Sequence, residues 1–171
     1  MRIMGIDPGI ATIGFGVVDS EKGKLSLINY GVITTPAHTS LSSRLDHIFD
    51  DMQEICSKFR PDIVAFEKLF FNTNLTTGIS VAHGRGVLLL AAYRAGMPIY
   101  EYTPLQVKKA VVGYGRADKN QVIDMVQRLL KMKCAPKPDD AADALAVAIC
   151  HARSATSLLT KIGGESSCST I

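Results

Sequence analysis

The spacing of apolar residues changes abruptly after residue 34, and this change limits the folds that the chain can adopt. Residues 2–7, 13–18 and 25–34 are short apolar segments typical of strands, with a turn at 21–24. Strands connected so closely pair antiparallel. From Leu41 to Phe59, apolar residues instead recur every three or four positions, which predicts an amphipathic helix of about five turns.

The rest of the chain alternates between strands and helices. Thr39 or Ser40 is a suitable N-cap for the first helix, and Pro61 stops it. We expect strands at 62–67 and 97–102, helices at 80–96, from 103 through 111, at 118–132 and from 139 to about 153, and loops at 68–78 and 113–120. This order predicts one α/β domain, a mixed five-stranded sheet with helices on both faces. We expect the domain to span 1–155 and a disordered tail to occupy 156–171.

Composition narrows the class of protein. The chain has 171 residues, 47% hydrophobic and 20% charged, which suits one globular domain and argues against disorder. No apolar run approaches the ~20 residues of a membrane helix, and we expect neither a membrane span nor a signal peptide. The four cysteines lie far apart without a C-x-x-C pair, which argues against a zinc site and favours free thiols in the cytoplasm.

Charge is unevenly distributed along the sequence. Residues 84–137 hold ten Lys or Arg and three acids, a net charge of +7, whereas the remainder carries −4. Such a segment suggests an anionic partner, with nucleic acid the first choice. A charged face that only contacts solvent is the alternative, and for the basic helix at 118–132 both interpretations stay open.

Four acids end predicted core elements without a basic partner nearby in sequence. Asp7 follows the first strand and Glu67 the strand at 62–67. Asp140 and Asp143 are spaced i, i+3 at the start of the last helix and therefore face the same side. Asp139 is most simply the N-cap of that helix. Each acid alone has a structural explanation, but the carboxylates of a cluster raise one another's pKa and destabilise the fold.

A divalent cation would remove this repulsion. Carboxylate oxygens without histidine or cysteine favour a hard ion, Mg²⁺ with Mn²⁺ as a substitute. Two such ions ~4 Å apart can activate water and stabilise the leaving oxygen in phosphodiester hydrolysis. The acids thus predict a metal site, and the basic segment predicts a binding surface for a polyanion.

Four motifs resemble those of the RuvC-type Holliday-junction resolvases: GIDPG at 5–9, FEKLFF at 66–71, VKKAVVGYGRADKNQV at 107–122 and DDAADALAVAICH at 139–151. The resemblance covers about residues 2–153. It implies an RNase H-like fold, a cytoplasmic homodimer, and Mg²⁺-dependent symmetric nicking of four-way DNA junctions in recombination and repair. The nicks would leave 5′-phosphate and 3′-hydroxyl ends, and a branch-migration helicase complex would be a partner.

The resemblance also implies roles for individual residues. The catalytic and metal-binding acids would be Asp7, Glu67, Asp140 and Asp143, with Asp139 an alternative to Asp140. The residues that contact DNA would be Lys108 and Lys119, with Lys109 and Arg116 as weaker additions, and Phe70, for which Phe71 is an alternative. The helix at 80–96, rich in Gly, Ala and Leu, is our candidate for the dimer contact.

Three other functions are weighed against this one. An ATP-handling protein of the actin and sugar-kinase group also opens with an Asp- and Gly-containing hairpin, but it needs two lobes and a second phosphate loop. An RNA-processing nuclease could share the fold, although the aromatic loop and the D-A-A-D helix favour a DNA junction. A non-catalytic junction-binding protein would not need all four acids.

Overall fold

The computed structural model describes residues 1–69 and 75–164 and contains five strands and five helices there. The strands are β1 (Arg2–Asp7), β2 (Thr12–Glu21), β3 (Lys24–Thr34), β4 (Ile63–Glu67) and β5 (Ile99–Tyr102). The helices are α1 (Leu41–Phe59), α2 (Leu75–Arg94), α3 (Pro104–Val112), α4 (Lys119–Leu129) and α5 (Asp139–Gly164). The predicted order of elements is confirmed.

The sheet is mixed, as predicted, with the order β3-β2-β1-β4-β5. Strands β1 to β3 form an antiparallel meander, whereas β4 runs parallel to both β1 and β5. The β2–β3 turn places Lys22 and Gly23 at φ +48° and +80°. Two consecutive left-handed residues match the twist of a tight hairpin, which explains the turn expected at 21–24.

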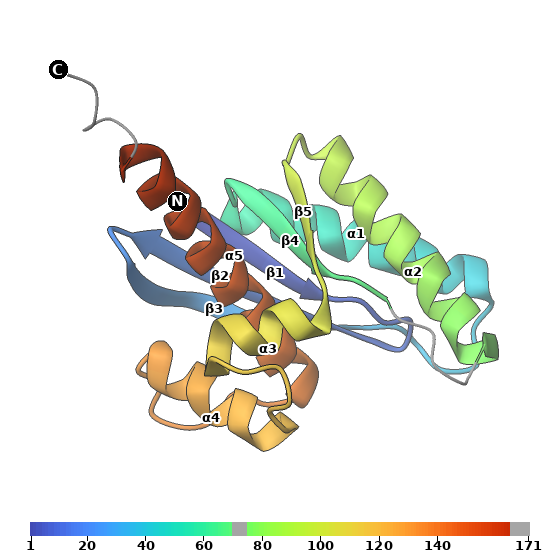
Figure 1. Ribbon diagram of the computed structural model, residues 1–171. Helices are drawn as coiled ribbons and strands as arrows, with labels where there is room; N and C mark the ends of the chain where they lie inside the picture. Colours follow the sequence, from blue (N-terminus) through green and yellow to red (C-terminus); the bar gives the residue numbers. More distant parts are fainter. Residues whose placement is uncertain (70–74, 165–171) are drawn as a thin grey trace, which may run out of the picture.

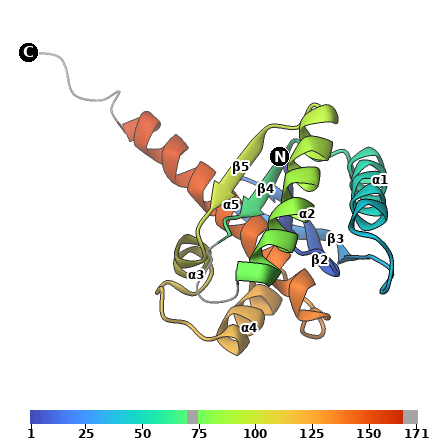
Figure 2. The ribbon, with the colours of Figure 1, turned by 90° about the vertical axis from the view of Figure 1, so that its right-hand side faces the viewer.

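Helices cover both faces of the sheet (Figure 1). On one face, α1 and α2 pack against large apolar side chains that include Met4, Ile6 and Ile13, all fully buried. On the other face, α3, α4 and α5 enclose a second cluster around Ile3 and Val18. Figure 2 shows the same two layers from the side, with α5 crossing the sheet. Two cores of this kind require a sheet that is apolar on both sides.

The ends of α1 follow their local sequence. The Ser40 side chain accepts a hydrogen bond from the Ser43 N–H, so Ser40 rather than Thr39 is the N-cap. At the other end Arg60 adopts φ +46°, and its N–H donates to the Cys56 carbonyl before Pro61 ends the helix.

Two predicted boundaries are wrong by five residues or more, and the other boundaries differ by at most four. Helix α2 begins at Leu75 rather than at residue 80, so the expected loop is helical from Leu75 on; residues 70–74 lie outside the described residues. Helix α5 continues to Gly164, well past Arg153. Both extensions lack a clear apolar period. The sequence pattern therefore does not predict the helix there, although the helical backbone continues. The division into residues 1–155 and 156–171 stays a prediction.

Helix α5 lies directly on the backbone of β1 and β2. A Cβ atom added at Gly5 would stand 2.1 Å from the carbonyl oxygen of Ala144, and one at Gly14 would stand 1.9 Å from that of Asp140. Real Cβ atoms do not come so close to backbone atoms, so only glycine permits this contact. The glycines therefore let the helix sit lower on the sheet than any side chain would allow.

Among the cysteines that the structure describes, Cys56 and Cys150 are buried, Cys134 is exposed and all three are free. Burial raises the pKa of the Cys56 and Cys150 thiols to about 11. Across the described residues, none of the helices has the length and apolar character needed to cross a membrane.

Candidate active site at the carboxyl ends of β1 and β4

Two of the predicted acids lie side by side at one edge of the sheet. Strands β1 and β4 are parallel neighbours, and Ile6 pairs with Phe66, which brings the next residues, Asp7 and Glu67, to the same level. Side chains alternate between the faces of a sheet. Because Ile3 and Ile63 belong to the core on the α5 side, Asp7 and Glu67 project toward that face as well.

The first turn of α5 brings the other two acids to this edge. Its backbone touches β2 at Gly14 through the carbonyl of Asp140, so the start of the helix is fixed against the sheet. From residue 141 to residue 152 the helix is buried at every position except Asp143, which is only half-buried. Asp143 is therefore the only acidic residue in this stretch and the only one that is not fully buried.

The carboxylates of the four acids act on one another electrostatically. Burial raises the pKa of Asp7 to about 8, and the charges of Asp143, Glu67 and Asp140 add to that rise. Burial and the charge of Asp143 raise the pKa of Glu67 to about 7. Burial also raises the pKa of Asp143. A protein that must bring four acids together gains no stability from their mutual repulsion, so the arrangement indicates function.

Lys119, the first residue of α4, supplies a positive charge to the cluster. Its Nζ lies 3.2 Å from Asp143 Oδ2 and 3.3 Å from Asp139 Oδ2. Burial alone would lower the pKa of the Lys119 ammonium, but Asp143 and Asp139 more than offset this, and the net shift is upward. The sequence predicted a lysine that contacts DNA phosphate; the structure has it paired with two acids.

The geometry distinguishes Asp139 from Asp140. Asp140 is half-buried and contributes to the raised pKa of Asp7, whereas the side chain of Asp139 is 60% exposed and pairs with Lys119. Asp139 and Asp140 both add to the rise in the pKa of Asp143, but only Asp140 adds to the rise in the pKa of Asp7. The choice of Asp140 as the fourth acid stays a prediction.

The donor set has the chemistry of a site for a hard cation. All four acids offer carboxylate oxygens, and Mg²⁺ and Mn²⁺ prefer such ligands. Within residues 1–69 and 75–164, however, no group of three or more His, Cys, Asp or Glu side chains is arranged to hold a metal ion. In this conformation the ammonium of Lys119 partly neutralises the acids.

The other residues predicted to contact DNA differ in whether they interact with the acids. Lys108, on α3, is close enough to lower the pKa of Glu67. Lys109 is exposed on the same helix, and Arg116 is exposed in the loop between α3 and α4. Phe70, like its alternative Phe71, lies outside the described residues. The structure thus brings Lys108 and Lys119 to the acids and leaves Lys109 and Arg116 exposed at the surface.

Comparison with known proteins gives a consistent answer. The family model for "Crossover junction endodeoxyribonuclease RuvC" matches residues 3–151. The chain belongs to the RuvC family. A relative of that name from Rubrobacter xylanophilus is 57% identical over 150 residues, which are 88% of this chain and 84% of the relative. RuvC proteins are endonucleases, so the prediction of a hydrolase that acts on DNA in recombination and repair is confirmed.

Solved structures agree in fold. The structure of Thermus thermophilus RuvC superposes with a TM-score of 0.85 at 41% identity, covering 92% of this chain and 96% of that one. T. thermophilus RuvC in complex with a Holliday junction substrate matches with a TM-score of 0.84 at 37% identity, with the same coverage. The predicted RNase H-like architecture is confirmed. The ATP-handling, RNA-processing and non-catalytic alternatives do not describe a RuvC-family endonuclease.

One contact at the site has no clear signal in the sequence. A Cβ atom at Gly84, in α2, would stand 2.5 Å from the carbonyl oxygen of Gly9, in the turn that follows Asp7. Helix α2 therefore touches the turn next to the first acid. The only hint in the sequence is the glycine itself, since a glycine inside a helix often marks a close approach of backbone.

Proposed function

We propose that this RuvC-family chain resolves four-way DNA junctions by symmetric paired nicks that leave 5′-phosphate and 3′-hydroxyl ends. The observation that carries the proposal is the cluster of Asp7, Glu67, Asp140 and Asp143, in which burial and mutual repulsion raise the pKa of three acids. The matched T. thermophilus RuvC in complex with a Holliday junction substrate supports the choice of DNA substrate.

The four acids would hold divalent cations, two Mg²⁺ ions per site, with Mn²⁺ able to substitute. When bound, such ions activate the attacking water and stabilise the charge that develops on a phosphodiester during its hydrolysis. The support is the donor set, which is rich in carboxylates and whose repulsion a cation would relieve. Asp7 and Glu67 would bind from the sheet, and Asp140 and Asp143 from α5.

The two lysines at the acids would position the DNA backbone. Lys119 would exchange its ion pairs with Asp139 and Asp143 for a contact with phosphate. Lys108 would contact a phosphate next to Glu67. Lysine is a mobile point charge on a flexible stem, which suits it to this exchange. Lys109 and Arg116 are exposed and would extend the same basic surface along a junction arm.

Phe70 would contact bases at the junction, as the family resemblance implies. A ring exposed in a loop can stack on an unpaired base regardless of its sequence. The proposal for Phe70 rests on the FEKLFF motif alone, and Phe71 remains the alternative.

The chain would act as a homodimer in contact through α2. Exposed residues of that helix recur at intervals of three and four at 79, 83, 86, 90 and 93, with 82 and 94 exposed beside them, and Ile79, Leu90 and Tyr93 are 59%, 47% and 75% exposed. Such a stripe is typical of a helix that packs against another helix. A Cβ at Gly86 in the middle would meet nothing within 4 Å, which leaves room for a second helix to approach.

A dimer about a two-fold axis would present two equivalent active sites to a junction that itself has two-fold symmetry. Replacement of Leu90 and Tyr93 by Glu should convert the dimer to a monomer, measured by light scattering after gel filtration. Leu105→Glu is the control, because Leu105 is 53% exposed but lies on α3. A dimer that survives the double change would exclude α2 as the interface.

Two further predictions rest on the resemblance alone. A branch-migration helicase complex would cooperate with the resolvase, and the protein would act in the cytoplasm, where bacterial DNA is found.

The central experiment compares single Asp→Asn variants on a labelled mobile four-way junction, with Mg²⁺ or with EDTA. Asp7→Asn and Asp140→Asn should bind the junction normally and lose cleavage, because each removes one negative charge from the cluster at almost constant volume. Asp139→Asn is the matched control and should retain most activity, since Asp139 faces Lys119. Normal cleavage by Asp7→Asn, or cleavage in EDTA, would refute the proposed metal site.

A further inference from the structure

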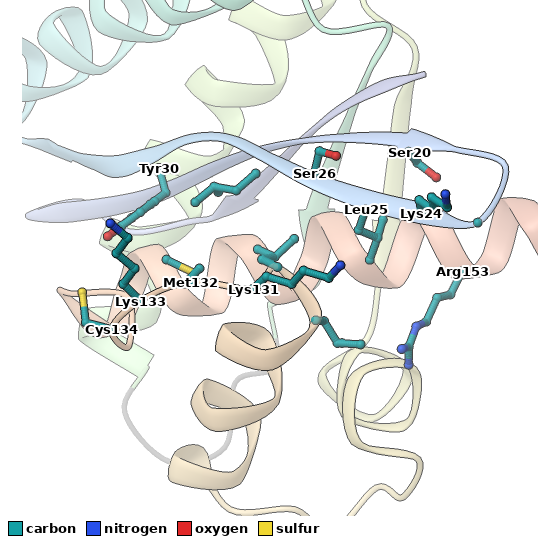
Figure 3. A pocket seen from close by; sticks show the side chains of 15 residues that line it. Ser20, Lys24, Leu25, Ser26, Tyr30, Lys131, Met132, Lys133, Cys134 and Arg153 are labelled. Carbon is teal, nitrogen blue, oxygen red and sulfur yellow. The ribbon is translucent and has the colours of Figure 1, made fainter.

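A groove of about 850 Å³ lies between β3 and the segment that connects α4 to α5, and α5 contributes to it through Ala152 and Arg153. None of the residues that line it belongs to the candidate active site or to the stripe on α2. Figure 3 shows the groove, with the β2–β3 hairpin on one side and the connecting segment on the other. The site and the dimer contact therefore leave it without an assigned role.

The floor of the groove is apolar. Leu25, Leu27 and Tyr30 reach it from β3, and Leu129 and Met132 reach it from the opposite side. All five are only partly buried, although they pack against the core on the α5 side. The groove thus exposes an edge of the hydrophobic core along a continuous depression. Concave apolar surface of this kind is typical of binding sites.

The groove is also uniformly basic. Its lining includes Lys24, Lys131, Lys133 and Arg153 and no acidic residue. None of these four side chains forms an ion pair with an acid in the part of the chain that the structure describes. In Figure 3, Lys133 lies toward the end marked by Tyr30, Lys131 near the middle, and Lys24 and Arg153 toward the other end. Positive charge therefore accompanies the apolar floor along its length.

The groove opens beside a free strand edge. Strand β3 ends the order β3-β2-β1-β4-β5, and among the described residues only β2 pairs with it. The outer N–H and C=O groups of an edge strand can pair with an added extended segment, whose alternate side chains then enter neighbouring pockets. DNA cannot pair with a strand in this manner, and an apolar floor contributes little to the binding of phosphates.

We propose that this groove binds an extended segment of a partner protein in which acidic and apolar residues alternate. The apolar side chains would cover the floor formed by Leu25, Leu27 and Met132, and the acidic side chains would pair with Lys131 and Lys133. Charge complementarity selects an acidic partner, and the edge of β3 selects an extended one. The inference is independent of the proposed function, because it uses none of the residues of the acid cluster.

Lys131 provides a variant that removes charge without harm to the fold. It adopts φ +52°, where glycine is favoured over lysine, so Lys131→Gly should keep or raise stability. Lys22 adopts φ +48° in the β2–β3 turn and is not among the lining residues, so Lys22→Gly is a matched control with the same chemical change. Lys133→Gln completes the test variant.

The test measures fluorescence anisotropy of labelled synthetic peptides with the full chain. A peptide of alternating Glu and Val should bind, whereas one of alternating Lys and Val and one of alternating Glu and Ser should not, because each lacks one of the two complementary features. Combined Lys131→Gly and Lys133→Gln should weaken binding roughly fivefold to tenfold, as expected for exposed ion pairs. Lys22→Gly should leave it unchanged.

Whether the peptide binds in the groove can be measured with a dye on Cys134, which lines the groove and is exposed. The labelling uses a Cys168→Ser background, since Cys56 and Cys150 are buried. The Glu and Val peptide should change the emission of this dye, and the Lys and Val peptide should not. Junction cleavage by the double lysine variant should match that of the parent protein, which keeps this test separate from that of the acid cluster.

Three outcomes would overturn the inference. The first is that no acidic peptide binds, and the second is that binding is the same in the parent and the double lysine variant. The third is that the double variant loses affinity for four-way or linear DNA and keeps its affinity for the peptide, which would make the groove part of the nucleic-acid surface instead.

Discussion

The two faces of the sheet pack against their helices in different ways. Toward α1 and α2, the sheet presents large side chains such as Met4, Ile6 and Ile13, which are fully buried. Toward α5, it presents Gly5 and Gly14 in addition to side chains such as Ile3 and Val18, and at these glycines backbone touches backbone. Large side chains bury apolar area and stabilise the fold, while backbone contact leaves little freedom of position. The face that carries the acids is the one built for exact placement.

The strongest test of this contrast is Gly14→Ala. The new methyl group would overlap the carbonyl of Asp140, so α5 must move away from the sheet. We expect a loss of about 3 kcal/mol in the free energy of unfolding, the upper range for overpacking. Displacement of the two acids on α5 should also reduce cleavage per folded molecule roughly 100-fold. Urea denaturation and junction cleavage at a temperature where the variant is folded measure the two effects.

Ile48→Ala is the counterpart on the other face. Ile48 is fully buried in α1, and its truncation should also cost about 3 kcal/mol of unfolding free energy because it leaves a cavity. Cleavage per folded molecule should stay within a factor of about two, since side chains around a cavity relax without moving α5. If both variants lost cleavage to the same extent, the α5 face would not differ from the α1 and α2 face in how it positions the acids.

Asp7→Asn should show that the acid cluster opposes folding when no cation is present. The folded state keeps a proton on Asp7 up to a pKa of about 8, whereas the unfolded chain releases it near 3.8. Parent stability in EDTA should therefore fall as pH rises from about 4 to about 8, and Asp7→Asn should lack this component. At pH 7, about three pH units above the pKa in the unfolded chain, the variant should be roughly 4 kcal/mol more stable, since one pKa unit is worth ~1.4 kcal/mol.

Thermal melts over this pH range, with and without Mg²⁺, measure that difference. Addition of Mg²⁺ should raise the melting temperature of the parent protein more than that of Asp7→Asn. Equal pH dependence of the two proteins in EDTA would mean that Asp7 is not buried among like charges.

Most of the fold could be predicted because its signals are local. The period of apolar residues in α1, the glycine in the β2–β3 turn and the proline after α1 each act within a few residues. The start of α2 could not be predicted in this way, since the helix is apolar on the side toward the sheet and also along the stripe with Leu90 and Tyr93. An amphipathic helix is recognised in a sequence by the difference between an apolar face and a polar face, and an exposed apolar stripe removes that difference.

The acids could be predicted for a different reason: a carboxylate at the end of an apolar element can be recognised in the sequence itself. The residues that surround the acids in the structure could not be predicted. The pairing of Lys119 with Asp143 joins residues of two helices, and the contact of Gly14 with Asp140 depends on how α5 crosses the sheet. The distinction between Asp139 and Asp140 is likewise a matter of which way one helical turn faces. Such facts arise from packing between elements that are distant in sequence.

The close approach of Gly84 to Gly9 has a mechanical consequence in the proposed dimer. The helix that would join the two subunits also rests on the turn that follows Asp7. A rotation of one α2 against the other would press on that turn in both subunits at the same moment and in the same direction. The two distant acid clusters would then shift together, because both rest on the same stiff pair of helices. No separate signal between the two active sites would be needed.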